Sequence, residues 1–137
     1  MPRAHDVKAT DRGEARNSLT KAQEMTSAAT NELAAGHWDS AGLNAVHAGI
    51  CAADAALIAS AGVRSISQDH GAAVALLDER VPEFASTQRR QLGGLLKEKN
   101  VVAYEQRLLT ETEARQLADQ ANRLTKWAAT VVKDQLR

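Results

Sequence analysis

Apolar residues recur at alternating steps of three and four residues along three long stretches of the chain. This spacing is that of one face of an α-helix, and it does not fit the two-residue alternation of a half-buried strand. The final stretch shows it without interruption, at Ala114, Leu117, Ala121, Leu124, Ala128 and Val131. We therefore expect an all-α protein, built as an antiparallel bundle of four to five helices.

The small side chains determine what kind of core such helices can form. The 137-residue chain holds 27 alanines but only four aromatic residues, Trp38, Phe84, Tyr104 and Trp127. Small residues favour helices that pack closely, whereas sheets favour aromatic and β-branched residues. A chain of this length is typical of one domain with its own core. We expect residues 1–137 to form a single domain, with residues 1–9 as a flexible N-terminal extension.

The positions of the apolar stripes set the expected helix bounds. Gly62 is expected to end the second helix, and Pro82 the third, because proline disfavours helical geometry in the residue before it. The paired glycines Gly93 and Gly94 fall inside the fourth helix, where each costs about 1 kcal/mol against alanine, so close packing or a kink is expected there. The five expected helices cover residues 10–35, 40–61, 69–81, 87–100 and 111–133.

Capping residues mark the ends of several of these helices. Gly36 stands where the first helix needs a C-terminal cap. Asp39 or Ser40 is expected to cap the second helix by accepting one of its free backbone N–H groups. Thr110 and Glu113 have the spacing of a capping box, in which the two side chains satisfy two such groups reciprocally. The last helix is therefore expected to begin directly after Thr110.

Charge and cysteine content exclude several classes of protein. The 17 basic and 17 acidic residues balance, which disfavours a domain whose whole surface attracts nucleic-acid phosphates. The single cysteine, Cys51, excludes an internal disulfide and favours a reducing compartment. No run approaches the roughly 18 apolar residues of a membrane span, and the N-terminus lacks the apolar segment of a signal peptide. We expect a cytoplasmic protein that does not act at a membrane.

One spacing in the second expected helix is compatible with metal binding. His47 and Cys51 are one turn apart and Asp54 follows three residues later, so three ligand types for a soft divalent metal lie close together. A fourth ligand and orienting partners are missing, which favours a packed polar cluster instead. The chain also lacks a nucleophile elbow, a phosphate loop and a glycine-rich dinucleotide turn. We expect no metal and no cofactor.

Four segments follow one another in an order that carries a family resemblance. They are residues 43–57, rich in small side chains, then His70-Gly71, residues 96–104, and residues 110–114 before the long last helix. In this order they resemble the HEPN family, the higher eukaryotes and prokaryotes nucleotide-binding helical bundles, over roughly residues 32–132. The resemblance implies a helical bundle that pairs with a second copy.

The same resemblance indicates which branch of the family fits. Members that cut RNA carry an arginine and, a few residues later, a histidine in the segment that residues 99–104 match. Here Lys99 and Asn100 stand at the arginine-asparagine place, and no histidine follows before Tyr104. The resemblance therefore implies a non-catalytic interaction module, such as the partner component of a toxin–antitoxin or nucleotidyltransferase-linked pair. Lys99, Asn100 and Tyr104 are the residues expected to bind a phosphate, a nucleotide or a partner.

Two other functions remain open at this point. Arg64 and His70 have the spacing of the nuclease pair, with His70 as general acid or base and Arg64 stabilising the phosphorane charge. They lie between the second and third expected helices rather than in the matched segment. The other alternative is a small-ligand pocket between the second and last helices, near His47.

The partners expected from the sequence are a second copy of the chain, a protein encoded nearby, and a nucleotide or RNA ligand. The homodimer has a reason in the residues, because alanine covers more of the second helix than one core-facing stripe requires. Small side chains on such a helix permit close approach of another helix. The alanines concerned are Ala45, Ala48, Ala52, Ala55, Ala56 and Ala59.

Overall fold

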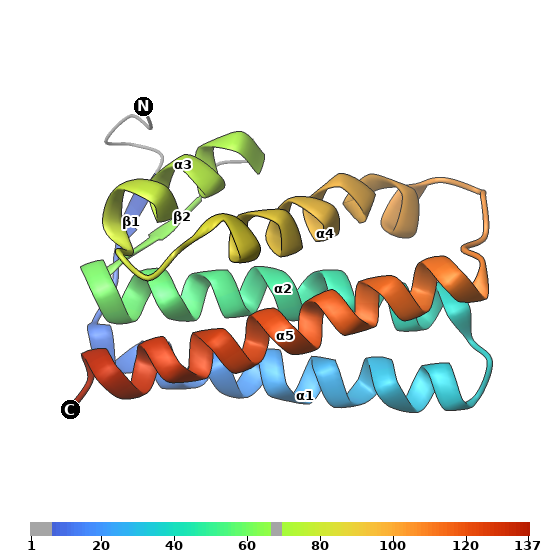
Figure 1. The fold of residues 1–137 in the computed structure, drawn as a ribbon, viewed down its shortest axis with the longest axis horizontal. Coiled ribbons are helices and arrows are strands. Elements are labelled where there is room, and N and C mark those ends of the chain that lie inside the picture. The colour runs from blue at the N-terminus through green and yellow to red at the C-terminus, as the bar shows by residue number, and fades with distance from the viewer. Residues whose placement is uncertain (1–6, 67–69) are drawn as a thin grey trace.

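The computed structural model describes residues 7–66 and 70–137. Within them the chain forms five α-helices, a short 3-10 turn and a two-stranded sheet (Figure 1). The expectation of an all-α bundle is confirmed, with the small sheet as an addition at one end. In chain order the elements are β1 (Val7–Ala9), η2 (Arg12–Glu14), α1 (Ala15–Ala34), α2 (Trp38–Ala61), β2 (Val63–Ser65), α3 (His70–Arg80), α4 (Ser86–Tyr104) and α5 (Glu111–Gln135).

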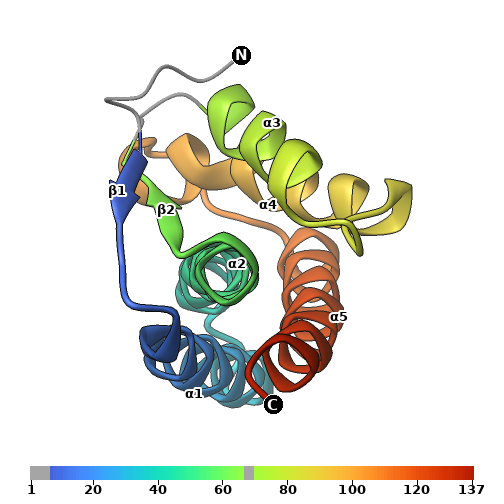
Figure 2. The same cartoon turned by 90° about the vertical axis from the view of Figure 1, so that its left-hand side faces the viewer.

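The helix α2 lies at the centre of the bundle, with α1, α4 and α5 around it (Figure 2). Helices α1 and α4 run in one direction, and α2 and α5 run in the other (Figure 1). Small residues allow this close arrangement. A Cβ placed on Gly49 would lie only 2.5 Å from Cδ1 of Leu95, so α4 crosses α2 where α2 has no side chain. This packing makes α2 the inner helix of the protein.

The alanines that suggested a dimer surface are all interior. Ala45, Ala48, Ala52, Ala55, Ala56 and Ala59 are each 0% exposed. They are buried where α2 packs on the other helices of the same chain, so none of them is accessible to a second copy. The alanines of α2 therefore provide no reason to expect a dimer.

The N-terminal segment differs from the flexible extension expected over residues 1–9. Residues 7–9 form β1, which pairs antiparallel with β2 so that Val7 lies opposite Ser65 and Lys8 opposite Arg64. The next residue, Thr10, donates its backbone N–H to the carbonyl of Gly62 at 2.8 Å. These contacts delay the start of α1 to Ala15. Residues 1–6 lie outside the described part of the chain.

The caps confirm two expectations and overturn one. Gly36 has a φ of 76°, and the bonds from its N–H to Leu33 and from the N–H of His37 to Glu32 close the end of α1. At the start of α5, Thr110 accepts a bond from the N–H of Glu113 as the capping box predicts. The N-cap of α2 is His37, which makes no side-chain cap bond, so capping by Asp39 or Ser40 is wrong.

The helix α4 is longer than expected and continuous through both glycines. It ends at Tyr104 instead of Asn100. A Cβ on Gly94 would lie 2.8 Å from Nε2 of Gln120, so the close packing expected at the glycine pair is present at Gly94. At Gly93 a Cβ would meet nothing within 4 Å. The first of the two glycines therefore faces open space.

The helix α2 is long and apolar enough to cross a membrane by length and composition, although no uninterrupted run of this length is obvious in the sequence. Its many alanines produce this property. In the bundle, 61% of its most apolar window is buried by the other helices. This burial agrees with the position of α2 as the inner helix of the bundle.

Candidate functional site

The residues expected to bind a phosphate or partner lie at the end of the bundle where α4 ends and α2 and α5 begin (Figure 1). Asn100 and Tyr104 are four residues apart on α4, so they share one face of it, and both are exposed. Lys99 lies about 100° away around the helix and is half-buried. The structure therefore brings Asn100 and Tyr104 together but points Lys99 in another direction.

Large apolar side chains are exposed at this same end. Tyr104 is 78% exposed, Leu108 in the linker between α4 and α5 is 74% exposed, and Leu43 on α2 is 37% exposed. A Cβ on Gly42 would contact side chains of both Val102 and Leu109, so α2, α4 and the linker meet here. We call Leu43, Tyr104 and Leu108 the apolar end.

A groove adjoins the apolar end. It has a volume of about 240 Å³ and is lined by residues 36–40, in the turn before α2 and its first residues, and by Leu108 and Leu109. The exposed Leu108 thus forms part of a concave surface. Such a surface is able to receive a side chain from another molecule.

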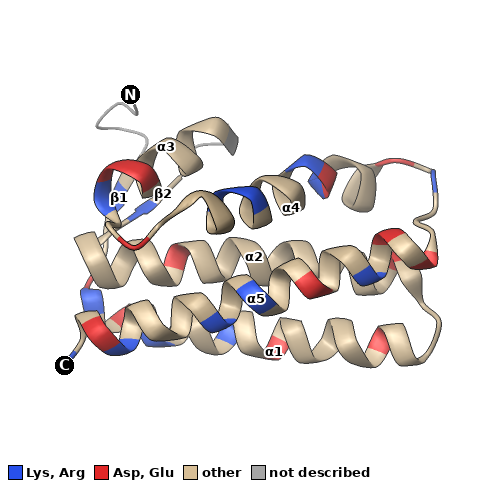
Figure 3. Ribbon diagram, in the orientation of Figure 1, with Lys and Arg blue, Asp and Glu red and all other residues tan. Residues whose placement is uncertain are grey.

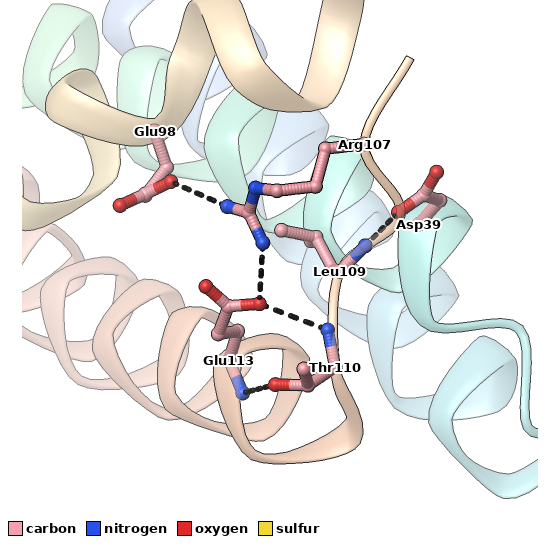
Figure 4. A network of polar contacts seen from close by, with 6 residues as sticks. All are labelled: Asp39, Glu98, Arg107, Leu109, Thr110 and Glu113. Atoms are coloured by element: carbon pink, nitrogen blue, oxygen red, sulfur yellow. Dashed lines mark hydrogen bonds and ion pairs between the residues drawn. The ribbon is translucent and has the colours of Figure 1, made fainter. Parts of the chain in front are cut away.

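A polar network holds the linker beside this groove (Figure 4). Nη1 of Arg107 donates to Oε1 of Glu113 at 2.9 Å, and its Nη2 lies 3.9 Å from Oε2 of Glu98. Glu113 also accepts the backbone N–H of Thr110 at 2.9 Å. These bonds, that of Arg107 first, lower the pKa of Glu113 from 4.5 to about 2. Arg107 thereby connects α4 to α5 through the linker.

Asp39 fixes the other side of the linker. Its Oδ1 accepts the backbone N–H of Leu109 at 2.6 Å (Figure 4). From the sequence, this carboxylate was expected to cap α2. Its actual partner, the N–H of Leu109, was missed because the residues around Asp39 carry no signal for a contact so far along the chain. Two independent anchors therefore hold the linker that carries Leu108.

The inner helix α2 carries few charged side chains, whereas the end of α4 and the linker carry many. The helix α2 carries only two charged side chains, Asp39 and Asp54, while both signs alternate along the end of α4 and the linker (Figure 3). Glu98 and Lys99 are half-buried, and Lys97, Glu105 and Arg107 are exposed. The charged side chains around the apolar end are therefore of both signs (Figure 3), so they do not create a strong electrostatic potential of a single sign.

The polar residues on α2 form no metal site. His47 is exposed, and Cys51 and Asp54 are half-buried. Burial, followed by the charge of Asp54, raises the pKa of the Cys51 thiol, which opposes thiolate ligation. Among the described residues, no three His, Cys, Asp or Glu side chains are grouped so that they could hold a metal ion.

The structure describes the side chain of only one member of the alternative nuclease pair. Arg64 lies in β2 and is exposed. His70 is the first residue of α3, and its side chain lies outside the described part of the chain. Nuclease use of Arg64 and His70 therefore stays a prediction.

Comparison with known proteins assigns no family to this geometry. The sequence matches no protein-family model and no curated protein sequence. The resemblance to the HEPN family rests on the residues quoted for it above.

Proposed function

We propose that the protein is a non-catalytic, HEPN-like interaction module whose apolar end binds a second copy of the chain. The observation that carries this proposal is the exposure of Tyr104 and Leu108, at 78% and 74%, with Leu108 lining a groove. Grouped apolar side chains in contact with water are typical of interaction surfaces, and tyrosine is enriched among the residues that dominate binding. Dimerisation buries these side chains.

The anchored linker supports the same proposal. Asp39 binds the Leu109 N–H on one side, and Arg107 binds Glu113 on the other. A surface that is already ordered loses less conformational entropy when it binds. Leu108 is thus held in place before its partner arrives.

A second copy suits this surface because its charges are mixed. In a symmetric dimer the same patch faces itself, so an acidic residue of one copy can meet a basic residue of the other. Glu105 directly follows α4 and interacts electrostatically with Arg107, while Lys97 lies two turns before the end of α4; both are exposed and form no ion pair with a described residue. A patch of one sign would instead repel its own copy.

The chemistry at the end of α4 favours binding over cleavage. Cutting a phosphodiester needs proton transfer, to which a positioned histidine contributes about a hundredfold or more, and residues 99–104 contain none. A tyrosine with its usual pKa near 10 is a poor base at neutral pH. Asn100 and Tyr104 on one exposed face instead suit hydrogen bonding and stacking on a nucleotide base or a protein partner.

The role as partner component of a toxin–antitoxin or nucleotidyltransferase-linked pair rests on the HEPN resemblance. In that role Tyr104 lies within the dimer interface, and Asn100 of each copy is exposed beside it. Lys99 is half-buried and lies about 100° around α4 from Asn100, so its charge acts on that face only at longer range.

Sedimentation equilibrium tests the proposed dimer. We expect wild type to be dimeric at tens of micromolar, and Tyr104→Ser and Leu108→Ser each to weaken the dimer about tenfold or more. The matched control is Ile66→Ser, because Ile66 is 48% exposed but follows β2 at the opposite end of α2. A monomeric wild type, or equal weakening by Ile66→Ser, contradicts the proposal.

A further inference from the structure

A second cavity lies at the opposite end of the bundle from the apolar end. It opens between the β1–β2 sheet, the start of α1 and the end of α2, and its volume is about 460 Å³. Its lining includes three cationic side chains from three elements, Lys8 of β1, Lys21 of α1 and Arg64 of β2. The cavity is therefore a place where positive charge converges.

Two of these cations face each other directly. Lys8 and Arg64 are register partners in the antiparallel pair, so their side chains emerge on the same face of the sheet. Like charges in directly opposed positions destabilise a sheet. An anion bound between them removes this repulsion.

The three cations are only partly balanced by protein carboxylates, because Arg64 interacts electrostatically with the nearby Asp54 without forming an ion pair with it. The side chains of Lys8, Lys21 and Arg64 make no ion pair and no hydrogen bond with any residue in the described ranges. By contrast, Arg89 and Arg107 bind carboxylates. Unpaired cations around a concave wall concentrate the positive potential inside it.

The lining also holds two carboxylates, Asp11 and Glu14, so its three cations exceed its acidic residues by one positive charge. The carboxylate of Asp11 accepts the backbone N–H of Gly13 at 2.8 Å, which holds it at the 3-10 turn but leaves its negative charge in place. Glu14 is exposed on that turn.

The remaining lining indicates the kind of ligand. Asn17 and Ser18 supply hydrogen-bond donors and acceptors, and Ile58 supplies an apolar floor. No aromatic side chain is among the described lining residues, so a nucleotide base has no platform on which to stack. The volume lies within the range of small-molecule sites.

We propose that this cavity binds a small molecule that carries a phosphate group and hydroxyl groups. Arg64 and the lysines Lys8 and Lys21 hold the phosphate, the arginine with its planar pair of N–H donors. Asn17 and Ser18 bind the hydroxyl groups. This site is separate from the apolar end and does not depend on dimerisation.

Titration of the ¹⁵N-labelled full chain with ribose 5-phosphate, followed by NMR, tests the proposal. Saturable shifts are expected at the amides of Lys8, Ser18, Lys21 and Arg64. Arg64→Met and Lys21→Met are each expected to weaken binding about tenfold, because each removes a charge-assisted hydrogen bond. Unphosphorylated ribose is expected to leave these amides unshifted at the same concentrations.

Arg90→Met is the matched control for loss of one positive charge. Arg90 is exposed on α4, has no partner in the described ranges and does not line the cavity. Equal weakening by Arg90→Met, or no shifts beyond those that ribose causes, overturns the proposal.

Discussion

The carboxylate of Asp39 accepts a 2.6 Å hydrogen bond from the backbone N–H of Leu109, 70 residues further along the chain. Leu109 is buried in the core, so without this bond its N–H has no acceptor at this position. The bond fastens the α4–α5 linker to the first turn of α2. Leu109 points into the core while its neighbour Leu108 remains exposed, which connects the folding of the linker to the proposed interaction surface.

Replacement of Asp39 by alanine is expected to lower the free energy of unfolding by about 1–3 kcal/mol, because it leaves the Leu109 N–H unsatisfied. Urea denaturation measures this change. The control is Ser40→Ala, because the Ser40 hydroxyl forms no hydrogen bond with a described residue and the side chain of Asn44 bonds to the Ser40 backbone carbonyl, which the substitution keeps. Hydrogen exchange at the Leu109 amide is expected to accelerate in Asp39→Ala alone. Equal stability of the two variants would show that the linker is held by other contacts.

The glycines of α2 and α4 provide a matched pair of substitutions. Gly49→Ala places a Cβ 2.5 Å from Cδ1 of the fully buried Leu95, so overpacking is expected to lower the unfolding free energy by about 1–2 kcal/mol. Gly93→Ala adds a Cβ in open space within a helix and is expected to raise it by about 0.5–1 kcal/mol. Thermal unfolding distinguishes the two signs. Stabilisation by Gly49→Ala contradicts the close crossing of α2 and α4.

Asp54 makes stability depend on pH. Burial raises its pKa from 3.8 to about 6, although the nearby Arg64 opposes the shift. The folded protein therefore holds this proton more tightly than the unfolded chain does. Stability from the protonated carboxyl is complete below about pH 4 and is lost as the pH rises through 6. The other groups near it are Cys51, whose own pKa is raised, and Lys21, which acts on Cys51.

Asp54→Asn, which is neutral at every pH, tests this dependence. At pH 7 it is expected to exceed wild type in unfolding free energy by up to about 3 kcal/mol, and the difference is expected to vanish below about pH 4. The control Asp119→Asn removes an exposed carboxylate that pairs with Arg123 on α5. A pH-independent difference between Asp54→Asn and wild type would assign the effect to packing instead of charge.

Local sequence features predicted some of these elements well. The capping box of Thr110 and Glu113 fixes the start of α5, because both of its bonds form within one turn. Gly36 and Gly62 adopt positive φ angles of 76° and 66° where α1 and α2 end. Such features depend on neighbours in the chain, so they are visible in the sequence.

Features that depend on distant contacts were missed. The strands β1 and β2 have three residues each, too few for an alternating pattern, and their pairing arises from residues far apart in the chain. Asp39 resembles a cap locally but binds Leu109. The cavity of Lys8, Lys21 and Arg64 combines three elements, so no motif marks it. The alanines of α2 showed that the helix packs closely but not that its own bundle covers them.

No RNA cleavage is expected, because the segment from Lys99 to Tyr104 contains no histidine. A cleavage assay on wild type, His70→Ala and Lys99→Ala checks this expectation. Binding without cleavage, weakened by Lys99→Ala and unchanged by His70→Ala, agrees with a binding role for the end of α4. Cleavage that His70→Ala abolishes and Lys99→Ala leaves intact would instead support the ribonuclease that uses Arg64 and His70.

The most direct test of the interaction module is an isotope-filtered NMR experiment on a mixture of labelled and unlabelled protein. Tyr104 is the only tyrosine in the chain, so its ring signals are identified without ambiguity. We predict intermolecular NOEs from this ring to the methyl groups of Leu43 or Leu108 in the other copy. Intermolecular NOEs that involve Ile66 but not Tyr104, or none at dimer-forming concentrations, would contradict the claim that the apolar end binds a second copy.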